Sequence, residues 1–481
     1  MTRYQNFIAG AWCDAASGAT FERRNPADGS VVGSFPASGA ADAAAALAGL
    51  SAGWRAWART PAEKRVEVLL KAADLIVARA DALGQDLTRE EGKTLSASTM
   101  EWKRAAANLR LYASEALRQT GQTFPADGNL VYSVREPVGI VLAITPWNFP
   151  ISLPSRKIGP ALATGNGVLY KPSEVAPLTG QRFVEILLEA GVPEGAIALV
   201  QGRGADLGSA LVEAEAVKAI TFTGSYATGC AIHRMAGPGK RLQLEMGGKN
   251  PTVVMPDADP ARAAQILMQG AFNLTGQACT ATSRAIIVGD IYDAVVEKLL
   301  ALTAKAVPGN GMDPTTTMGP SACKAQYDRV REMIGVGVAE GLALLTGTAD
   351  LPERDEETGG FFIAPTIFGN VPPTSRLAKE EIFGPVLALH RAADYAEAIE
   401  MANAVEYGLA AAIVTRDTGT ILSFAQDIEA GIVKINSATG GVAGTAPFGG
   451  IKHSSNQTYK EQAGHGVMDF YTMTRTVYLG S

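Results

Sequence analysis

Hydrophobic and polar positions change their spacing several times along the 481-residue chain, and each change marks a different kind of structure. Residues 4–36 alternate short apolar stretches with turn residues, which predicts small strands or hairpins. From residue 40 to residue 117 the apolar positions recur at helical spacing in alanine-rich sequence. The chain is therefore expected to begin with short strands and to continue with a long helical region.

Strands and helices then alternate in two successive regions. In the first, predicted strands at 139–144, 167–170, 196–200 and 219–222 are separated by predicted helices at 152–163, 177–190 and 205–213. In the second, predicted strands at 252–255, 285–288, 362–367, 411–415 and 431–435 accompany helices at 260–274, 291–305 and 395–403. Such alternation is typical of doubly wound parallel sheets, whose ligands bind at the carboxyl ends of the strands.

Two distant segments, 129–138 and 469–479, alternate in polarity with a period of two. They could pair as an extended arm, and the exposed edge of such an arm favours contact with a second subunit.

Composition limits the class of protein. The chain is too long for one core, and 47% hydrophobic with 19% charged residues suits a globular protein of two or three domains. A net charge of -6 gives no basic surface, so we expect no nucleic-acid partner. The apolar run at 138–154 is interrupted by prolines and the N-terminus lacks a signal-peptide core, so no membrane partner is expected. Four scattered cysteines and four histidines show no metal-binding spacing, which predicts no metal and a reducing, cytoplasmic setting.

Two glycine-containing turns between a strand and a helix compete for the phosphates of a cofactor. The first contains Gly204 and Gly208, but its last glycine comes one residue too late for the GxGxxG pattern. The second contains Gly224 and Ser225, whose backbone N–H groups and hydroxyl would lie at a helix N-terminus, a favourable place for pyrophosphate. Alone, either is equally compatible with an ordinary turn.

A third motif, Lys171-Pro172-Ser173-Glu174, follows a predicted strand. A lysine and a carboxylate there can both hydrogen-bond ribose hydroxyls, and the carboxylate disfavours a 2′-phosphate. The alternative is a solvated loop with a helix cap.

Three residues are candidates for chemistry. Asn148, between aromatic residues and prolines, suits an oxyanion hole but could be a turn former. Glu245, flanked by apolar residues and glycines, suits a general base but could belong to a structural ion pair. Cys279 follows a small flexible turn, and a cysteine is a nucleophile only when its thiolate is accessible.

Together these motifs resemble the NAD(P)-dependent aldehyde dehydrogenase superfamily. They occur in the same order as in that family and span nearly the whole chain. The resembling blocks are Pro-Trp-Asn-Phe-Pro from Pro146, Lys-Pro-Ser-Glu from Lys171, Phe-Thr-Gly-Ser from Phe222, Glu-Met-Gly-Gly-Lys from Glu245, Gly-Gln-Ala-Cys from Gly276, Glu-Glu-Ile-Phe-Gly-Pro from Glu380 and Pro-Phe-Gly-Gly-Ile-Lys from Pro447. The resemblance implies an α/β fold with two doubly wound parallel-sheet domains and a β-arm, assembled as a homodimer or homotetramer. The expected divisions are a dinucleotide-binding domain at 1–119 and 141–247, a catalytic domain at 248–465, and an oligomerisation arm at 120–140 and 466–481.

The resemblance also implies the chemistry. The thiolate of Cys279 would attack a small-molecule aldehyde, with the oxyanion held by the Asn148 amide and the Cys279 backbone N–H. Hydride would pass to NAD, with NADP also possible, and Glu245 would activate the water that hydrolyses the thioester. The expected cofactor-binding residues are Trp147, Asn148, Lys171, Ser173, Glu174, Gly204, Gly208, Gly224, Ser225, Met246, Glu381 and Phe383.

Arg156 is the main indication of substrate class. It lies two helical turns beyond Asn148, so both should face the same side. The alternative is a surface ion pair, but in semialdehyde dehydrogenases of the superfamily an arginine here clamps the substrate's distal carboxylate. Succinate semialdehyde dehydrogenases usually add a second arginine where this chain has Asn273, and short stretches after Cys279 and at 458–462 are instead similar to bacterial 2-oxoglutarate semialdehyde (2,5-dioxopentanoate) dehydrogenases.

The expected substrate is therefore a carboxylate-bearing semialdehyde such as 2-oxoglutarate semialdehyde. The expected substrate-binding residues are Arg156, Phe149, Asn273 and Phe448. The alternatives are succinate semialdehyde, a broad range of aliphatic or aromatic aldehydes, release of the acyl group to coenzyme A, and a catalytically silent binding protein on the same fold.

Overall fold

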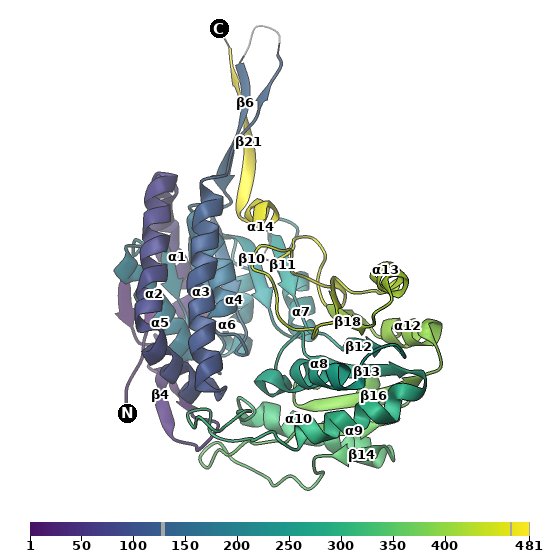
Figure 1. Ribbon diagram of the computed structural model, residues 1–481. Helices are drawn as coiled ribbons and strands as arrows, with labels where there is room; N and C mark the ends of the chain where they lie inside the picture. The colour runs from purple at the N-terminus through teal and green to yellow at the C-terminus, as the bar shows by residue number, and fades with distance from the viewer. Residues whose placement is uncertain (127–129, 462–463, 481) are drawn as a thin grey trace.

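The computed structural model describes residues 1–126, 130–461 and 464–480, and it shows two α/β bodies side by side with a projecting β-arm (Figure 1). The strand order of the first sheet is β11-β10-β7-β8-β9-β1-β2. Its strands are β1 (Asn6–Ile8), β2 (Ala11–Cys13), β7 (Ile140–Ile144), β8 (Gly167–Lys171), β9 (Ile197–Leu199), β10 (Val217–Thr223) and β11 (Arg241–Glu245). The five strands from β11 to β9 are parallel, and β1 and β2 extend the sheet antiparallel.

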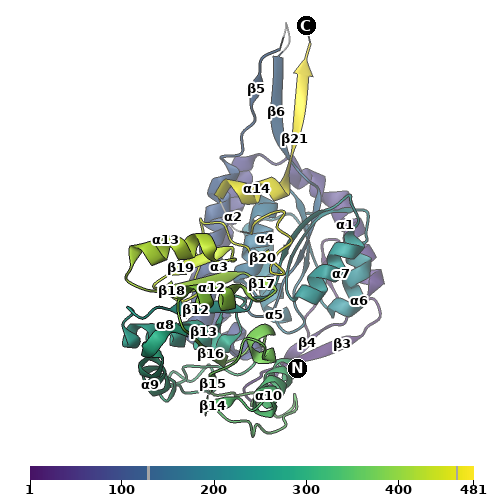
Figure 2. The ribbon, with the colours of Figure 1, turned by 90° about the vertical axis from the view of Figure 1, so that its right-hand side faces the viewer.

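Helices cover both faces of this sheet, because alternate strand residues point to opposite sides. Val141 and Ala143 of β7 belong to one buried cluster and Ile140 and Leu142 to another. The first cluster contains residues of α2 (Ala62–Glu91), α3 (Leu95–Ala116), α4 (Ser152–Ala163) and α5 (Pro177–Ala190). The second contains residues of α1 (Ala40–Ala58), α6 (Gly204–Val212) and α7 (Tyr226–Ala236), seen on one side in Figure 2.

The second sheet has the order β14-β15-β16-β13-β12-β18-β19, and only its edge strand β14 is antiparallel. Its strands are β12 (Asn250–Val254), β13 (Thr282–Val288), β14 (Ala343–Thr346), β15 (Thr366–Gly369), β16 (Val386–Ala392), β18 (Ala410–Val414) and β19 (Ile432–Ile435). The accompanying helices are α8 (Pro260–Phe272), α9 (Tyr292–Thr303), α10 (Lys324–Ala339), α11 (Arg376–Lys379), α12 (Tyr395–Asn403) and α13 (Thr418–Asp427). The two parallel sheets predicted from the sequence are thus present. Small two-stranded sheets join β3 (Thr20–Arg24) to β4 (Val31–Pro36), and β17 (Tyr407–Gly408) to β20 (Ile451–Lys452).

The arm contains β5 (Thr123–Phe124), β6 (Leu130–Pro137) and β21 (Thr472–Leu479). β21 pairs antiparallel with β6 along its whole length, as the alternating polarity of the two segments predicts. Asn129, the first residue of the predicted strand, lies outside the described residues.

The prediction of a strand from residue 469 was wrong for its first three residues, which end the helix α14 (Gly464–Tyr471). Phe470 and Tyr471 are fully buried in the cluster that covers the first sheet, so packing overrides the local alternation. Among the described residues, no helix is long and apolar enough to cross a membrane.

Candidate active site

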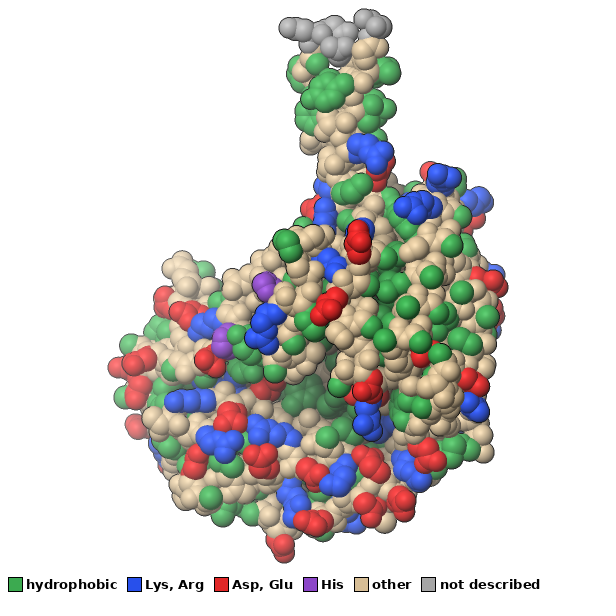
Figure 3. Space-filling model, turned by 180° about the vertical axis from the view of Figure 1, so that it is seen from behind, with side chains coloured by type: hydrophobic (Ala, Val, Ile, Leu, Met, Phe, Trp, Pro, Cys, Tyr) green, Lys and Arg blue, Asp and Glu red, His purple; other side chains and the backbone are tan. Residues whose placement is uncertain are grey.

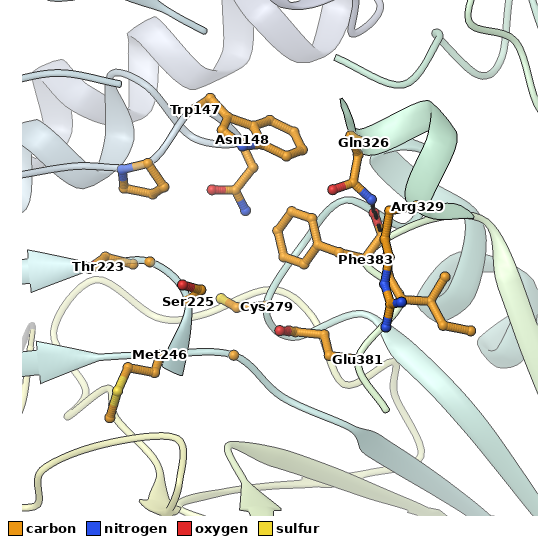
Figure 4. A pocket seen from close by; sticks show the side chains of 14 residues that line it. Trp147, Asn148, Thr223, Ser225, Met246, Cys279, Gln326, Arg329, Glu381 and Phe383 are labelled. Atoms are coloured by element: carbon orange, nitrogen blue, oxygen red, sulfur yellow. Dashed lines mark hydrogen bonds between the residues drawn. The ribbon is translucent and has the colours of Figure 1, made fainter. Parts of the chain in front are cut away.

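A cavity of about 260 Å³ lies between the two sheets. One side is formed by residues that follow strands β7, β10 and β11, and the other by residues that precede β13 and β16. It is lined by Pro146, Trp147, Asn148, Thr223, Gly224, Ser225, Met246, Gly247, Cys279, Gln326, Arg329, Glu381, Ile382 and Phe383. Eight residues predicted for catalysis or cofactor binding therefore meet in one place: Trp147, Asn148, Gly224, Ser225, Met246, Cys279, Glu381 and Phe383 (Figure 4).

Cys279 is presented by an irregular segment between α8 and β13. In the short 3-10 helix at Asn273–Gly276, Leu274 and Thr275 have φ of 52° and 57°, which is costly for side chains of this kind. Gly276 has φ of 67°, and a Cβ there would lie 2.2 Å from the carbonyl oxygen of Gly384. This turn needs glycine, and it fixes the direction from which the thiol enters the cavity.

The Cys279 thiol is only partly accessible, and its surroundings favour the neutral form. Burial raises its pKa to about 12, and the nearby carboxylates of Glu381, Glu461 and Glu245 add to this effect, while Arg156 opposes it. The resting thiol is therefore protonated at neutral pH, and its proton must be removed when it attacks.

Glu245 ends β11 and is buried directly beside the cavity-lining Met246. Burial raises its pKa well above the usual value, and the neighbouring Glu461 raises it further. Its Oε1 accepts a long hydrogen bond of 3.4 Å from the Ser455 hydroxyl, and its Oε2 has no partner among the described residues. A carboxylate in this environment has a proton affinity suited to a general base.

Hydrogen bonds hold both the backbone and the side chain of Asn148. Its backbone carbonyl accepts a hydrogen bond of 2.6 Å from Lys93 Nζ, and its Nδ2 donates to the Gln277 carbonyl over 3.0 Å. Lys93 is itself buried and paired with Glu101 at 2.6 Å. The Asn148 amide is thus fixed above the segment that carries Cys279, and its second N–H remains for an oxyanion.

Aromatic and acidic side chains shape the wall opposite the first sheet. The rings of Trp147 and Phe383 meet edge to face at 5.4 Å. Glu381 accepts a hydrogen bond of 2.8 Å from the Gly248 N–H, and burial raises its pKa to about 7. A Cβ at Gly247 would lie 2.1 Å from Glu381 Oε2, so this close approach requires glycine.

The other predicted cofactor residues lie outside this cavity. Lys171 Nζ donates to the Pro172 carbonyl at 3.0 Å and lies 3.4 Å from Glu174, so the predicted lysine and carboxylate do meet, beside the hydroxyl of Ser173 at the end of β8. Burial lowers the pKa of Lys171.

The glycines of the first turn lie in α6. Gly204 is its first residue, and a Cβ at Gly204 or Gly208 would meet no atom within 4 Å, so the protein itself imposes no need for glycine at either position. Ser225 caps the N-terminus of α7 by accepting from the Thr228 N–H at 3.3 Å, so the second turn has the helix-terminal geometry expected for phosphate.

The four residues predicted to bind substrate are not gathered in this cavity. Arg156 is buried in α4, Phe149 lies with its ring 5.1 Å from Lys93 Nζ, and Phe448 is buried. Asn273 is exposed at the start of the 3-10 helix, away from the lining residues.

Sequence reasoning assigned no role to a buried ion pair behind the base. Glu461 Oε2 accepts from Lys157 Nζ at 2.7 Å and from the Thr223 hydroxyl at 3.1 Å, and all three residues are buried. The available signal was Lys157 within the largely apolar segment 151–163, whereas Glu461 lies in polar sequence and gave none. Gln326 and Arg329, which line the cavity, lie on α10, a helix for which no prediction was made.

The Aldehyde dehydrogenase family model matches residues 12–477, and the chain belongs to this family. It is an enzyme that oxidises an aldehyde, as its motifs predict.

Among its relatives, the Alpha-ketoglutaric semialdehyde dehydrogenase of Bacillus subtilis is 41% identical over 480 residues, covering 99% of this chain and 98% of the relative. The Alpha-ketoglutarate semialdehyde dehydrogenase of Haloferax volcanii is 40% identical over 98% of both chains. The crystal structure of an NAD-dependent aldehyde dehydrogenase from Sinorhizobium meliloti matches with a TM-score of 0.93 and 35% identity, over 100% of this chain and 95% of the other.

Proposed function

We propose that this aldehyde dehydrogenase acts on an aldehyde that carries a distal carboxylate, and that it forms the dicarboxylic product with NAD(P)+ as the hydride acceptor. The observation that carries the substrate class is Arg156. Its guanidinium is buried, its Nε has no hydrogen-bond partner among the described residues, and its charge acts on the Cys279 thiol.

Such a guanidinium is costly to bury unless an anion binds to it. The nearest anionic group acting on Arg156 is Glu461, whose Oε2 is already engaged by Lys157. A substrate carboxylate can supply the missing partner with two parallel hydrogen bonds. The two semialdehyde dehydrogenase relatives support this substrate class.

The proposed reaction follows from the positions of three side chains. As the sulfur of Cys279 bonds to the aldehyde carbon, the thiol proton is lost through water to the solvent, which leaves Glu245 free for the later hydrolysis. The free N–H of the Asn148 amide and the backbone N–H of Cys279 stabilise the oxyanion. After oxidation leaves a thioester on Cys279, Glu245 removes a proton from the water that hydrolyses it.

The residues present fit a nicotinamide dinucleotide. The Trp147–Phe383 pair offers an apolar wall, Glu381 offers a carboxylate to a ribose, and Ser225 lies at a helix N-terminus suited to phosphate. When bound, the cofactor supplies the hydride acceptor. Glu174 beside Lys171 favours a ribose with a free 2′-hydroxyl, so we expect NAD to be preferred and NADP to be accepted less well. A related solved structure, that of 3,6-anhydro-L-galactose dehydrogenase in complex with NAP, matches with a TM-score of 0.95 at 32% identity, over 100% of both chains.

We also propose that the three-stranded arm joins copies of this chain as a homodimer or homotetramer. Figure 3 shows hydrophobic side chains along the arm, where Leu130, Tyr478 and Leu479 are exposed. Apolar side chains on a thin projecting sheet gain most from contact with another subunit. The division into a dinucleotide-binding domain, a catalytic domain and this arm, with boundaries as predicted above, is part of the same proposal. The four unpaired cysteines support a reducing, cytoplasmic setting.

A panel of aldehydes tests the proposed function. The purified enzyme is given 2-oxoglutarate semialdehyde, succinate semialdehyde, pentanal and benzaldehyde, each with NAD or NADP and with or without coenzyme A. We expect the highest kcat/KM with a carboxylate-bearing aldehyde, a free acid as product, and no dependence on coenzyme A. Equal kcat/KM for pentanal and the semialdehydes would overturn the substrate class.

A further inference from the structure

A stripe of polar residues on α3 faces the beginning of α4. Glu101 Oε1 accepts hydrogen bonds of 3.0 Å from the N–H groups of Ile151 and Ser152. Asn108, seven residues later, donates from Nδ2 to the Ser155 hydroxyl at 2.9 Å. Arg104 lies three residues after Glu101 and four before Asn108, and residues at these spacings share one helix face. Arg104 is therefore on the stripe of α3 that faces α4, between two residues that contact it.

Arg104 is a cation without an anionic partner. It is exposed, and in the described part of the chain no carboxylate pairs with it. Burial lowers the pKa of Arg156, and the charge of Arg104 lowers it further. The charge of Arg104 also lowers the pKa of Lys93, whereas the carboxylates of Glu101 and Glu91, which form ion pairs with Lys93, raise it. The charges of the exposed Arg104 and the buried Arg156 repel each other, and an anion bound near both would relieve this repulsion.

The loop at 436–447 links the segment that carries the nucleophile to the face of α3 that carries Arg104. Thr439 Oγ1 donates to the Thr280 carbonyl at 2.7 Å, next to Cys279. Farther along the loop, a Cβ at Gly444 would lie 3.9 Å from Asn108 Oδ1. The loop thus spans from the residue after the nucleophile to the face of α3 that carries Arg104. Arg104 is exposed on this helix face, whereas Arg156 is buried and its charge acts on the Cys279 thiol.

We propose that Arg104 selects substrates: its exposed guanidinium attracts the carboxylate of an ω-oxo acid at the entrance, and the carboxylate then passes to Arg156 as the aldehyde reaches Cys279. This inference rests on the proposed carboxylate-bearing substrate. Because Arg104 is in contact with water, its effect is modest and sensitive to salt, whereas that of the buried Arg156 is large.

Three variants test Arg104. Arg104→Gln removes the charge, and Arg104→Lys keeps it. Lys103→Gln removes an equal charge from the preceding residue of α3, which is also exposed. Initial rates are measured with succinate semialdehyde, 2-oxoglutarate semialdehyde and the uncharged pentanal, at low and at high sodium chloride.

For Arg104→Gln at low salt, we expect kcat/KM for both semialdehydes to fall about 5-fold through KM, the size of an exposed charge effect. The value for pentanal should not change, the difference from wild type should shrink at high salt, and Arg104→Lys should retain most of the activity. Lys103→Gln should behave as wild type.

The outcomes separate this inference from the proposed function. If wild type prefers the semialdehydes and Arg104→Gln keeps that preference, or loses no more than Lys103→Gln, the role of Arg104 is overturned while the substrate class stands. If wild type shows no preference for the semialdehydes over pentanal, both are overturned. A loss that is equal for charged and uncharged aldehydes would make Arg104 a structural residue.

Discussion

The balance of charge around Cys279 decides how this site works. Three glutamates, Glu245, Glu381 and Glu461, act on the thiol and favour its protonated form, while Arg156 opposes them. The carboxylate of Glu461 also raises the pKa of Glu245, because like charges are costly in a buried site. The resting enzyme therefore holds protons that must leave before or during attack.

The pH dependence of activity should reflect this. Glu245 accepts a proton from the hydrolytic water only when it is ionised, and its pKa lies well above the usual value, so kcat should rise with pH through the pKa of Glu245. Measured from pH 5.5 to 9.5, the wild-type profile should show this rise. The Glu245→Gln variant should lose at least 100-fold in turnover, the lower end of typical general-base effects (about 10²–10⁴-fold), and its profile should be flatter. An unchanged profile in the variant would assign the base to another residue.

The buried guanidinium of Arg156 should distinguish substrates by charge. In Arg156→Gln we expect KM for 2-oxoglutarate semialdehyde to rise about 10- to 100-fold, the worth of hydrogen bonds to a charged group. KM for pentanal should change little, which also controls for misfolding. Steady-state kinetics with both aldehydes check this, and equal losses would show that Arg156 serves only packing.

At the scale of residues, the sequence predicted which side chains come together, and their catalytic roles stay predictions. Asn148, Glu245 and Cys279 lie in distinctive motifs, and the structure brings Asn148 and Cys279 to one cavity with Glu245 beside it. The partners Lys157 and Glu461 could not be paired from the sequence, because 304 residues separate them and only the fold joins them. Lys93, which holds the Asn148 carbonyl, was missed for the same reason.

Short elements with unusual backbone position the nucleophile. In the Gly276→Ala variant, the new Cβ would lie 2.2 Å from the Gly384 carbonyl oxygen at a φ of 67°. We expect a loss of stability of about 1–3 kcal/mol and a larger loss of turnover, because the segment carrying Cys279 must shift. Thermal unfolding and initial rates measure the two effects.

Gly335→Ala is the matched control. Gly335 is exposed within α10 and a Cβ there meets no atom within 4 Å, so alanine should be neutral or stabilising by about 1 kcal/mol. Wild-type stability and turnover in Gly276→Ala would show that the turn does not constrain the nucleophile.

At the scale of elements, strong periodic patterns were predicted closely and ambiguous ones were not. The helices at Pro177–Ala190 and Tyr395–Asn403 have the predicted bounds, because proline or aspartate marks the start of each. The strand predicted near 362–367 begins only at Thr366, and no prediction covered α10 or β16. β16 is buried on both faces, so it lacks the alternation that reveals a half-exposed strand.

The arm is a feature of the whole molecule, since β6 and β21 pair although they lie in distant parts of the chain. We expect the double variant Tyr478→Asp, Leu479→Asp to reduce the particle mass measured by size-exclusion chromatography with light scattering. Charges on these exposed residues should be costly only where another subunit covers them. Val338→Asp, an equally simple change on an exposed residue of α10, is the control. A wild-type monomer, or an unchanged mass in the double variant, would contradict the proposed assembly.

The arrangement of the two sheets around one cavity was beyond what periodicity alone could predict. Each sheet could be predicted from its own alternation, but the cavity joins ends of β7, β10 and β11 to segments before β13 and β16. The family motifs predicted that the two sides meet, because the motifs contain residues from both sides of the cavity.

The central claim is that Cys279 forms a thioester that Glu245 helps to hydrolyse. Intact-protein mass spectrometry tests it most directly, with the Glu245→Gln variant mixed with NAD and 2-oxoglutarate semialdehyde, quenched in acid and compared with wild type and with Cys279→Ser. We predict that Glu245→Gln gains the mass of one acyl group, located on Cys279 by peptide mapping, that wild type gains little, and that Cys279→Ser gains none and turns over no aldehyde. Turnover by Cys279→Ser, or an acyl group on another residue, would contradict the account.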